Sequence, residues 1–321
     1  MQIGISWVKW NDGYLDKGTT AVVNGLFIVL VFLSHFAQYA PEYIVNYIGR
    51  YLEQLIVVMF LFYSGYGCAV QYLKKGQDYL RSFPRKRILA TLVNFDVAVL
   101  AFLVVGLLLG KVFTVKQVLL SFVCWESLGN SNWYIFAIML CYATFWAVFS
   151  TVKTKYLAGG GVVVLGLGMM VVGLALVKPS YWYDTMMTFG AGVLYGLFRE
   201  QVERFVRERY WGCLAAALGV FLATRYLPLP GRLHFATFNC QSIAFAALVV
   251  MGTMKVVVRC PALRWCGEHL FPLYIYQRIP MIVFSALHPA AFQDWRCWIY
   301  CALSAMIAVL VAAIYPKFQF R

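Results

Sequence analysis

The chain has 321 residues, of which 62% are hydrophobic and only 12% charged, and its formal net charge is +14. Such a composition is far more apolar than that of a soluble domain, and no polar tract is long enough to form a separate one. Residues 1–321 are therefore expected to form a single transmembrane domain. Because positive residues collect in the cytoplasmic loops of membrane proteins, the basic excess indicates topology rather than nucleic-acid binding.

Apolar stretches of about twenty residues, the length that a helix needs to cross a bilayer, recur along the whole chain. They predict an all-α, polytopic membrane protein with ten transmembrane helices. The predicted spans are 21–40, 54–72, 88–110, 133–150, 156–177, 183–198, 211–227, 235–258, 270–287 and 295–315. Successive loops between the spans lie on alternate sides of the membrane. With this assignment, nineteen Lys and Arg residues fall on the same side as the N-terminus and seven on the opposite side. This asymmetry predicts that both termini are cytoplasmic.

The first span begins near Asn24 and ends at His35, with only apolar residues between Leu26 and Leu33. Eleven helical residues return Asn24 and His35 to nearly the same face, about 16 Å apart along the axis. A polar side chain at that depth is costly in lipid, so His35 is expected to face protein or a wet cavity. It either links helices by hydrogen bonds or acts as a catalytic base, since imidazole titrates near neutral pH.

A second polar feature is the basic segment before the third span, formed by Arg81, Arg85, Lys86 and Arg87. Guanidinium groups suit phosphate oxygens, so this segment is a candidate site for a phosphate-bearing donor. Its charge is equally explained by topology and by contact with anionic lipid.

Nine cysteines form no CxxC pair, and the four histidines have no cysteine or carboxylate at ligand spacing. No metal site is therefore expected. Hydrolase, nucleotide-binding and metalloprotease motifs are also absent from the sequence. Asp96, about two turns into the third span, and Glu268 are the carboxylates nearest the hydrophobic spans.

The order of several features is informative. A first span ending in His35 is followed by an aromatic Ser-Gly-Tyr segment at 64–66, the basic segment, an Asn-Trp-Tyr start to the fourth span at 132–134, and Phe-Pro-Leu-Tyr-Ile-Tyr at 271–276. In this order, over residues 17–315, the chain resembles the acyltransferase-3 family of bacterial integral membrane acyltransferases.

The resemblance implies a multi-pass protein of the bacterial inner (cytoplasmic) membrane that moves an acyl group, often acetyl from acetyl-CoA, onto a hydroxyl of a cell-envelope glycan or lipid. It implies that His35 is the essential histidine of the first helix, and that Arg85 and Arg87 match basic positions associated with the donor. Two positions depart from the family pattern. Asn24 stands where the family usually has Lys or Arg. Gln277 stands where the family usually has the histidine of a late Tyr-x-x-His pattern.

These observations lead to one principal hypothesis. His35 takes a proton from an acceptor hydroxyl, which attacks the thioester of acyl-CoA, while Arg81, Arg85, Lys86 and Arg87 bind the phosphates of the donor. The candidate substrate-binding residues are Asn24, Tyr63, Ser64, Glu126, Asn130, Asn132 and Trp133.

Two other functions are open at this stage. One is a transporter or flippase for a lipid-linked glycan, with His35 and Asp96 as proton or substrate groups. The other is a non-catalytic membrane scaffold, in which His35 is replaceable. The sequence also leaves a homodimer open.

Overall fold

The computed structural model describes residues 3–40, 52–152, 156–227, 229 and 234–320. These residues form mostly α-helix, as predicted, and the strands among them are β1 (Gly4–Trp7) and β2 (Val256–Arg259). Each predicted span coincides with one helix or with two consecutive helices. The spans are α1 (Lys17–Ala37), η1 with α3 (Glu53–Val57, Val58–Lys75), η2 with α5 (Pro84–Leu89, Ala90–Leu108), α7 (Asn132–Thr151), α8 (Tyr156–Ala175), α9 (Met187–Leu197), α11 (Tyr210–Tyr226), α12 (His234–Thr253), α14 with α15 (Leu270–Tyr276, Arg278–Leu287) and α16 (Cys297–Ile314).

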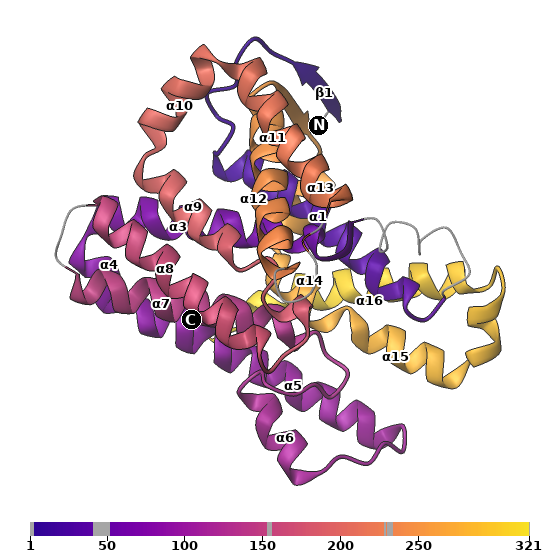
Figure 1. Cartoon of the computed structure of the whole chain (residues 1–321). Helices are drawn as coiled ribbons and strands as arrows, with labels where there is room; N and C mark the ends of the chain where they lie inside the picture. The colour runs from indigo at the N-terminus through magenta and orange to yellow at the C-terminus, as the bar shows by residue number, and fades with distance from the viewer. Residues whose placement is uncertain (1–2, 41–51, 153–155, 228, 230–233, 321) are drawn as a thin grey trace.

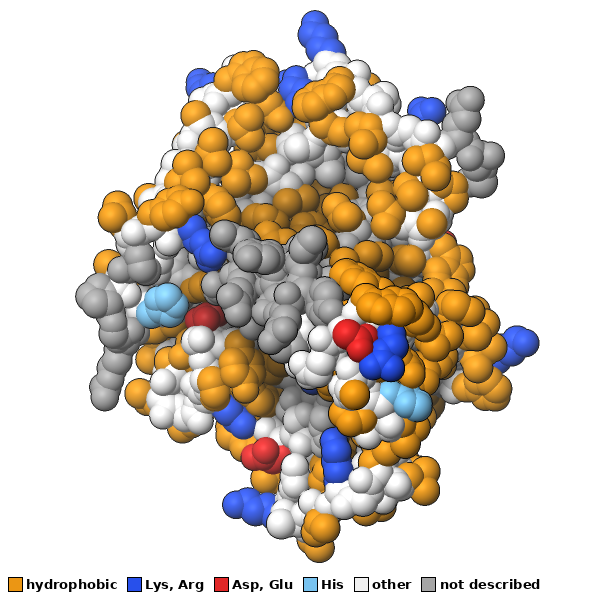
Figure 2. Space-filling model, turned by 90° about the vertical axis from the view of Figure 1, so that its right-hand side faces the viewer, with side chains coloured by type: hydrophobic (Ala, Val, Ile, Leu, Met, Phe, Trp, Pro, Cys, Tyr) orange, Lys and Arg blue, Asp and Glu red, His pale blue; other side chains and the backbone are white. Residues whose placement is uncertain are grey.

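Shorter helices connect these spans. They are α4 (Gln77–Phe83), α6 (Val115–Phe122), η3 (Ser180–Trp182), α10 (Arg199–Glu208), α13 (Pro261–Glu268), η5 (Pro289–Gln293) and η6 (Tyr315–Lys317). Within the described residues, seven helical segments are long and apolar enough to cross a membrane, and α8 adds a shorter apolar helix. Figure 2 shows hydrophobic side chains over most of the described surface on one face, with few charges among them. The protein is therefore a multi-pass membrane protein.

Several connecting segments that are predicted to lie on the same side of the membrane contact each other. On the side predicted to be cytoplasmic, β1 pairs antiparallel with β2, and Arg207 in α10 forms a 2.7 Å ion pair with Asp12. On the other side, Lys178 donates to the carbonyl of Trp125 at 2.9 Å. Figure 1 shows β1, α10 and α13 at one end of the helical body and α6 at the opposite end. These contacts agree with the predicted sides of the segments that make them.

Glycines let two pairs of helices cross closely. A Cβ at Gly25 of α1 would overlap the backbone of Leu263 in α13, and one at Gly267 would overlap the backbone of Ala21. The contact of α3 with α9 depends in the same way on Gly65, where a Cβ would overlap the carbonyl of Phe189. Small residues of this kind permit the close helix contacts that stabilise membrane proteins. They hold the first half of α1 firmly against α13.

The main hydrophobic core runs between α1, α3, α5, α7, α9 and α12. A smaller cluster packs the end of α1 against α15, η5 and α16. Its buried members are Phe36, Ala40, Met281, Phe292, Cys297 and Cys301. Since Phe36 follows His35 directly, this smaller cluster fixes the end of α1 at which the histidine lies.

Candidate active site

His35 is only 8% exposed and contacts polar side chains from two distant parts of the chain. Its Nε2 lies 3.1 Å from Oγ of Ser131, and its Nδ1 lies 3.2 Å from the amide Nε2 of Gln277. Ser131 directly precedes α7, and Gln277 joins α14 to α15. Three segments therefore meet at one buried imidazole.

The tautomer of His35 is coupled to which atom of the Gln277 amide faces Nδ1, and in this arrangement that atom is the nitrogen. An amide nitrogen can only donate, so Nδ1 of the ring accepts and the ring proton lies on Nε2. This proton is then donated to Oγ of Ser131. In the described residues, Oε1 of Gln277 is buried without a hydrogen-bond partner. The amide thus keeps an unused acceptor next to the histidine.

Arg278 brings a guanidinium group to the same cluster. Its Nη1 donates to Oγ of Ser131 at 3.2 Å, and its Nη2 donates to Oε1 of Gln38 at 3.1 Å. The hydroxyl of Tyr39 lies 3.4 Å from the same Nη2. Arg278 therefore connects the start of α15 with the start of α7 and the end of α1, and it places positive charge beside the serine. We refer to His35, Ser131, Gln277 and Arg278 as the His35 cluster.

The loop before α7 presents Ser131 through hydrogen bonds made by its two neighbours. The side chain of Asn132 donates to the carbonyls of Cys124 and Glu126, at 2.7 and 3.0 Å. Asn130 accepts from the backbone N–H of Leu128 through Oδ1 at 3.0 Å. Both asparagines were predicted to bind substrate, and the structure shows them holding this loop.

Gly129 is required in that loop for two reasons. Its φ is +111°, which side chains other than glycine rarely adopt. A Cβ at this position would also lie 3.1 Å from Cδ1 of Ile282 in α15. The loop can therefore approach α15, where Arg278 lies, only with glycine at this position.

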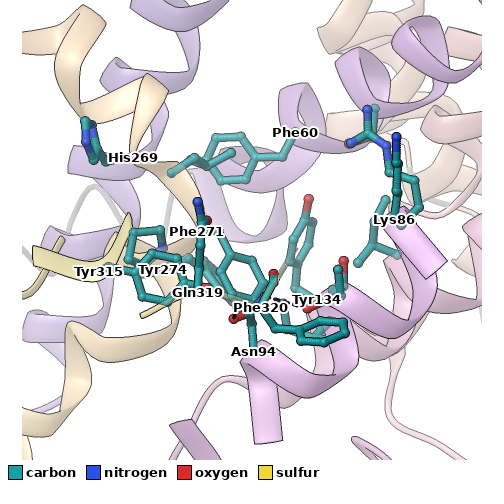
Figure 3. A pocket seen from close by; sticks show the side chains of 18 of the residues that line it. Phe60, Lys86, Asn94, Tyr134, His269, Phe271, Tyr274, Tyr315, Gln319 and Phe320 are labelled. Carbon is teal, nitrogen blue, oxygen red and sulfur yellow. Dashed lines mark hydrogen bonds between the residues drawn. The ribbon is translucent and has the colours of Figure 1, made fainter. Parts of the chain in front are cut away.

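A cavity of about 670 Å³ lies between α3, η2, α5, α7, α14 and the C-terminal segment. Figure 3 shows Lys86 and His269 on opposite sides of it. The side-chain amide of Asn94 holds Phe320 at the cavity wall. It donates to the backbone carbonyl of Phe320 and accepts from its backbone N–H, both at 2.9 Å. The wall is largely aromatic and includes Phe60, Tyr134, Tyr142, Phe271, Tyr274, Tyr315 and Phe320.

The cavity ends one helical turn from the His35 cluster. Tyr134 and Tyr274 line it, and their ring centroids are 5.1 Å apart. Tyr134 comes three residues after Ser131 on α7, and Tyr274 comes three residues before Gln277. The ring of Tyr274 also lies 6.3 Å from that of His35. Two helices thus lead from the cavity wall to the histidine.

The basic segment divides between the cavity and the surface. Lys86 and Arg87 line the cavity, together with Ser64 of α3. Arg81 pairs instead with Asp78 at 3.5 Å, and both of these side chains are more than 80% exposed. Arg85 is exposed and is not part of the cavity wall.

The other candidates make no hydrogen bond or ring contact with His35 among the described residues. Asn24 is about three turns earlier on α1, close to the α1–α13 contact. Tyr63 is buried, and its hydroxyl has no partner in the described part of the chain. Trp133 packs edge-on against Tyr134 and Tyr181. Whether any of them binds substrate stays a prediction.

Glu126 lies in the loop before α7, near an aromatic site for Lys178. The Nζ of Lys178 is 3.8 Å from the ring centroid of Trp125 and 4.1 Å from that of Trp182. Burial lowers the pKa of Lys178, and the nearby Glu126 carboxylate opposes that shift. This loop is thereby fastened to the segment before α9, which limits the movement of the residues leading to Ser131.

Sequence patterns alone did not single out Ser131, Arg278 and the tyrosine pair. Arg278 carried the clearest signal, because an arginine inside an apolar span is costly unless it has a function or a partner. Gln277 was noted as a departure from the family pattern, and it proves to be a direct partner of His35. Among the described residues, no three His, Cys, Asp or Glu side chains are grouped so as to hold a metal ion.

An all-α membrane fold with a buried polar cluster beside a large cavity defines a class of membrane proteins that includes enzymes and transporters. The family model described as an acyltransferase domain matches residues 22–315 of the chain. The chain therefore belongs to the acyltransferase-3 family and is an acyltransferase. No match was found among curated proteins or solved structures.

Proposed function

We propose that the protein is an O-acyltransferase of the bacterial cytoplasmic membrane. It moves an acyl group, with acetyl as the simplest case, from acyl-CoA to a hydroxyl of a cell-envelope glycan or lipid-linked sugar. The observation that carries the proposal is the cavity, which has basic residues at one end and leads, at the other, to within one turn of the His35 cluster.

The cavity suits a donor with a charged end and an apolar arm. Its volume of about 670 Å³ is within the range of small-molecule sites. Lys86 and Arg87 supply cationic donors for phosphate oxygens at the end predicted to be cytoplasmic. The aromatic wall then accommodates the arm, and the thioester would reach the pair of Tyr134 and Tyr274.

The acceptor would approach from the opposite side. Ser131 and the loop before it lie on the side predicted to be external, where envelope glycans are. At the cluster, His35 provides a group for proton transfer, a contribution of about 10²–10⁴-fold in rate. Arg278 provides positive charge for the oxyanion that forms when a hydroxyl attacks a thioester.

The alternatives from the sequence receive less support. Family membership makes the chain an acyltransferase, and no contact in the described structure favours a transporter or a scaffold. His35 has specific polar partners on both ring nitrogens, as expected of an oriented catalytic group.

The test uses purified protein in detergent with labelled acetyl-CoA. Release of CoA should rise when envelope extract is added, and label should appear in the extract. No release under either condition would contradict the proposal, and transport of a glycan without release would favour the flippase.

Arg87→Ala should weaken donor binding about 10- to 150-fold, because a hydrogen bond to a charged group contributes about 1.5–3 kcal/mol. Arg81→Ala is the matched control, since Arg81 lies on the surface in an exposed ion pair. Equal weakening by the two changes would show that only the general positive field acts on the donor.

A further inference from the structure

We propose that Ser131 is the nucleophile of the reaction and carries the acyl group as an ester between donor and acceptor. The inference rests on the proposed acyltransferase function and specifies its route. Transfer would then occur in two displacements at one buried centre, rather than by direct attack of the acceptor on acyl-CoA.

The geometry is that of an activated nucleophile. A hydroxyl becomes reactive when a base lies within hydrogen-bond reach and a third group orients the base. Here Oγ of Ser131 is 3.1 Å from His35, and the other nitrogen of His35 is 3.2 Å from Gln277. Ser131 is only 7% exposed, so water has little access to an ester formed there.

The surroundings of Ser131 stabilise negative charge. Arg278 donates to its Oγ at 3.2 Å, which favours the alkoxide that develops during attack. Ser131 is also the N-cap of α7, a helix of 20 residues. The positive end of the helix dipole of α7 therefore lies near the reacting atoms.

Gln277 supplies the tautomer change that the reaction needs. In the resting arrangement its Nε2 donates to His35, so the ring proton points at Ser131 and the serine cannot transfer its own proton to the ring. A half-turn of the amide presents Oε1, which has no partner in the described residues, to Nδ1. This arrangement favours the tautomer with its proton on Nδ1, in which Nε2 has a free lone pair facing Ser131; the ring releases the Nε2 proton to water and takes one up from water at Nδ1, so its proton count is unchanged.

The first displacement begins from this second arrangement. Oγ of Ser131 attacks the carbonyl carbon of the thioester while its proton moves to Nε2 of His35. The oxyanion forms beside Arg278 and the start of α7. The C–S bond then breaks, the proton on Nε2 passes to the thiolate sulfur, and free CoA leaves an acyl ester on Ser131.

The second displacement repeats these steps with the acceptor. The acceptor hydroxyl gives its proton to Nε2 of His35 and attacks the carbonyl carbon of the ester. The bond between that carbon and Oγ breaks, and Oγ takes the proton back. No oxidant, metal or further co-reactant is needed.

The position of Ser131 explains the advantage of this route. The cavity ends at Tyr134, one turn further along α7, so a thioester in the cavity ends close to the serine. The acceptor comes from the side on which the loop before α7 is predicted to lie. A covalent intermediate allows the two substrates to use the same buried serine in turn, without meeting.

The experiment uses the full-length protein with labelled acetyl-CoA and no acceptor. An acyl-serine predicts that label becomes attached to the protein, on the peptide containing Ser131, in mass spectrometry. In a second reaction, with unlabelled acetyl-CoA and labelled free CoA, it also predicts that label appears in acetyl-CoA, because the first displacement is reversible. If Ser131 has only a structural role, neither the attached label nor the exchange should be observed.

Ser131→Ala should abolish both the attached label and the exchange. Ser285→Ala is the matched control and should retain both, because Ser285 lies on α15 and bonds only to the carbonyl of Ile282 in the described structure. Ser131→Cys guards against misfolding of the alanine variant. It should carry the label as a thioester that neutral hydroxylamine removes.

Two outcomes overturn the inference in distinguishable ways. Transfer to envelope extract by the unaltered protein, with no label on Ser131 and no exchange, would show direct transfer and leave the acyltransferase function standing. Absence of CoA release even with extract would remove the function itself, and the acyl-serine with it.

Discussion

Replacing Arg278 by glutamine should reduce acyl transfer strongly while the protein still folds. The guanidinium donates to Ser131 at 3.2 Å and to Gln38 at 3.1 Å, and so connects three segments. One hydrogen bond to a charged group contributes about 1.5–3 kcal/mol. Loss of the bond to Ser131 alone corresponds to a fall of about 10- to 150-fold in kcat/KM.

Arg278→Lys should restore only part of the rate. Lysine supplies a point charge, but it lacks the planar fork that reaches Ser131 and Gln38 at once. The assay is release of CoA from acetyl-CoA with envelope extract present, and the melting temperature of each variant is measured in parallel. Arg296→Gln is the matched control, because Arg296 is exposed and pairs with its neighbour Asp294.

The reasoning would be refuted if Arg278→Gln kept its full rate at an unchanged melting temperature. Arg278 would then have no part in the reaction. A loss of rate matched by an equally large loss in the arginine control would point to a general effect of charge on that side of the membrane. Neither result agrees with the hydrogen bond to Ser131.

Other predictions concern the cluster, its loop and the topology. His35→Gln should lower turnover about 10²–10⁴-fold with donor binding retained, and near-normal turnover would show that the histidine is structural. Gln277→Glu, whose carboxylate can only accept a hydrogen bond, should sustain CoA exchange, whereas exchange by Gln277→Leu should slow. Gly129→Ala should cost about 1–3 kcal/mol in thermal unfolding because its φ is +111°. Gly161→Ala, where a Cβ meets nothing within 4 Å, should change little. Reporters inserted in α6 and in α10 should report outside and inside, and the reverse pair would invert the assignment of donor and acceptor sides.

The smaller parts of the site differ in how far they could be predicted. Arg87 could be predicted as a donor-site candidate because charge density at the start of a span is visible in the sequence, and the structure places it on the cavity wall. Arg81 and Arg85 could not be separated from Arg87 in the sequence, since only the path of the chain through α4 and η2 decides which side chain faces the cavity. Asn130 and Asn132, in the loop before α7, were predicted only as candidate substrate-binding residues. Their hydrogen bonds to the loop depend on its folded backbone and leave no mark in composition.

The sequence by itself determined the membrane class, the positions of the spans and the asymmetry of charge, and it singled out His35 as the candidate base. These follow from local properties, because hydropathy over about twenty residues and the cost of a polar group in lipid depend on neighbours in the chain. Only the tertiary structure decided that Ser131, Gln277 and Arg278 surround His35. Ser131 is 96 residues from His35 and Gln277 is 242 residues away, so their contacts arise from the packing of α1, α7, α14 and α15. That packing depends on how distant helix faces fit together, which no local pattern specifies.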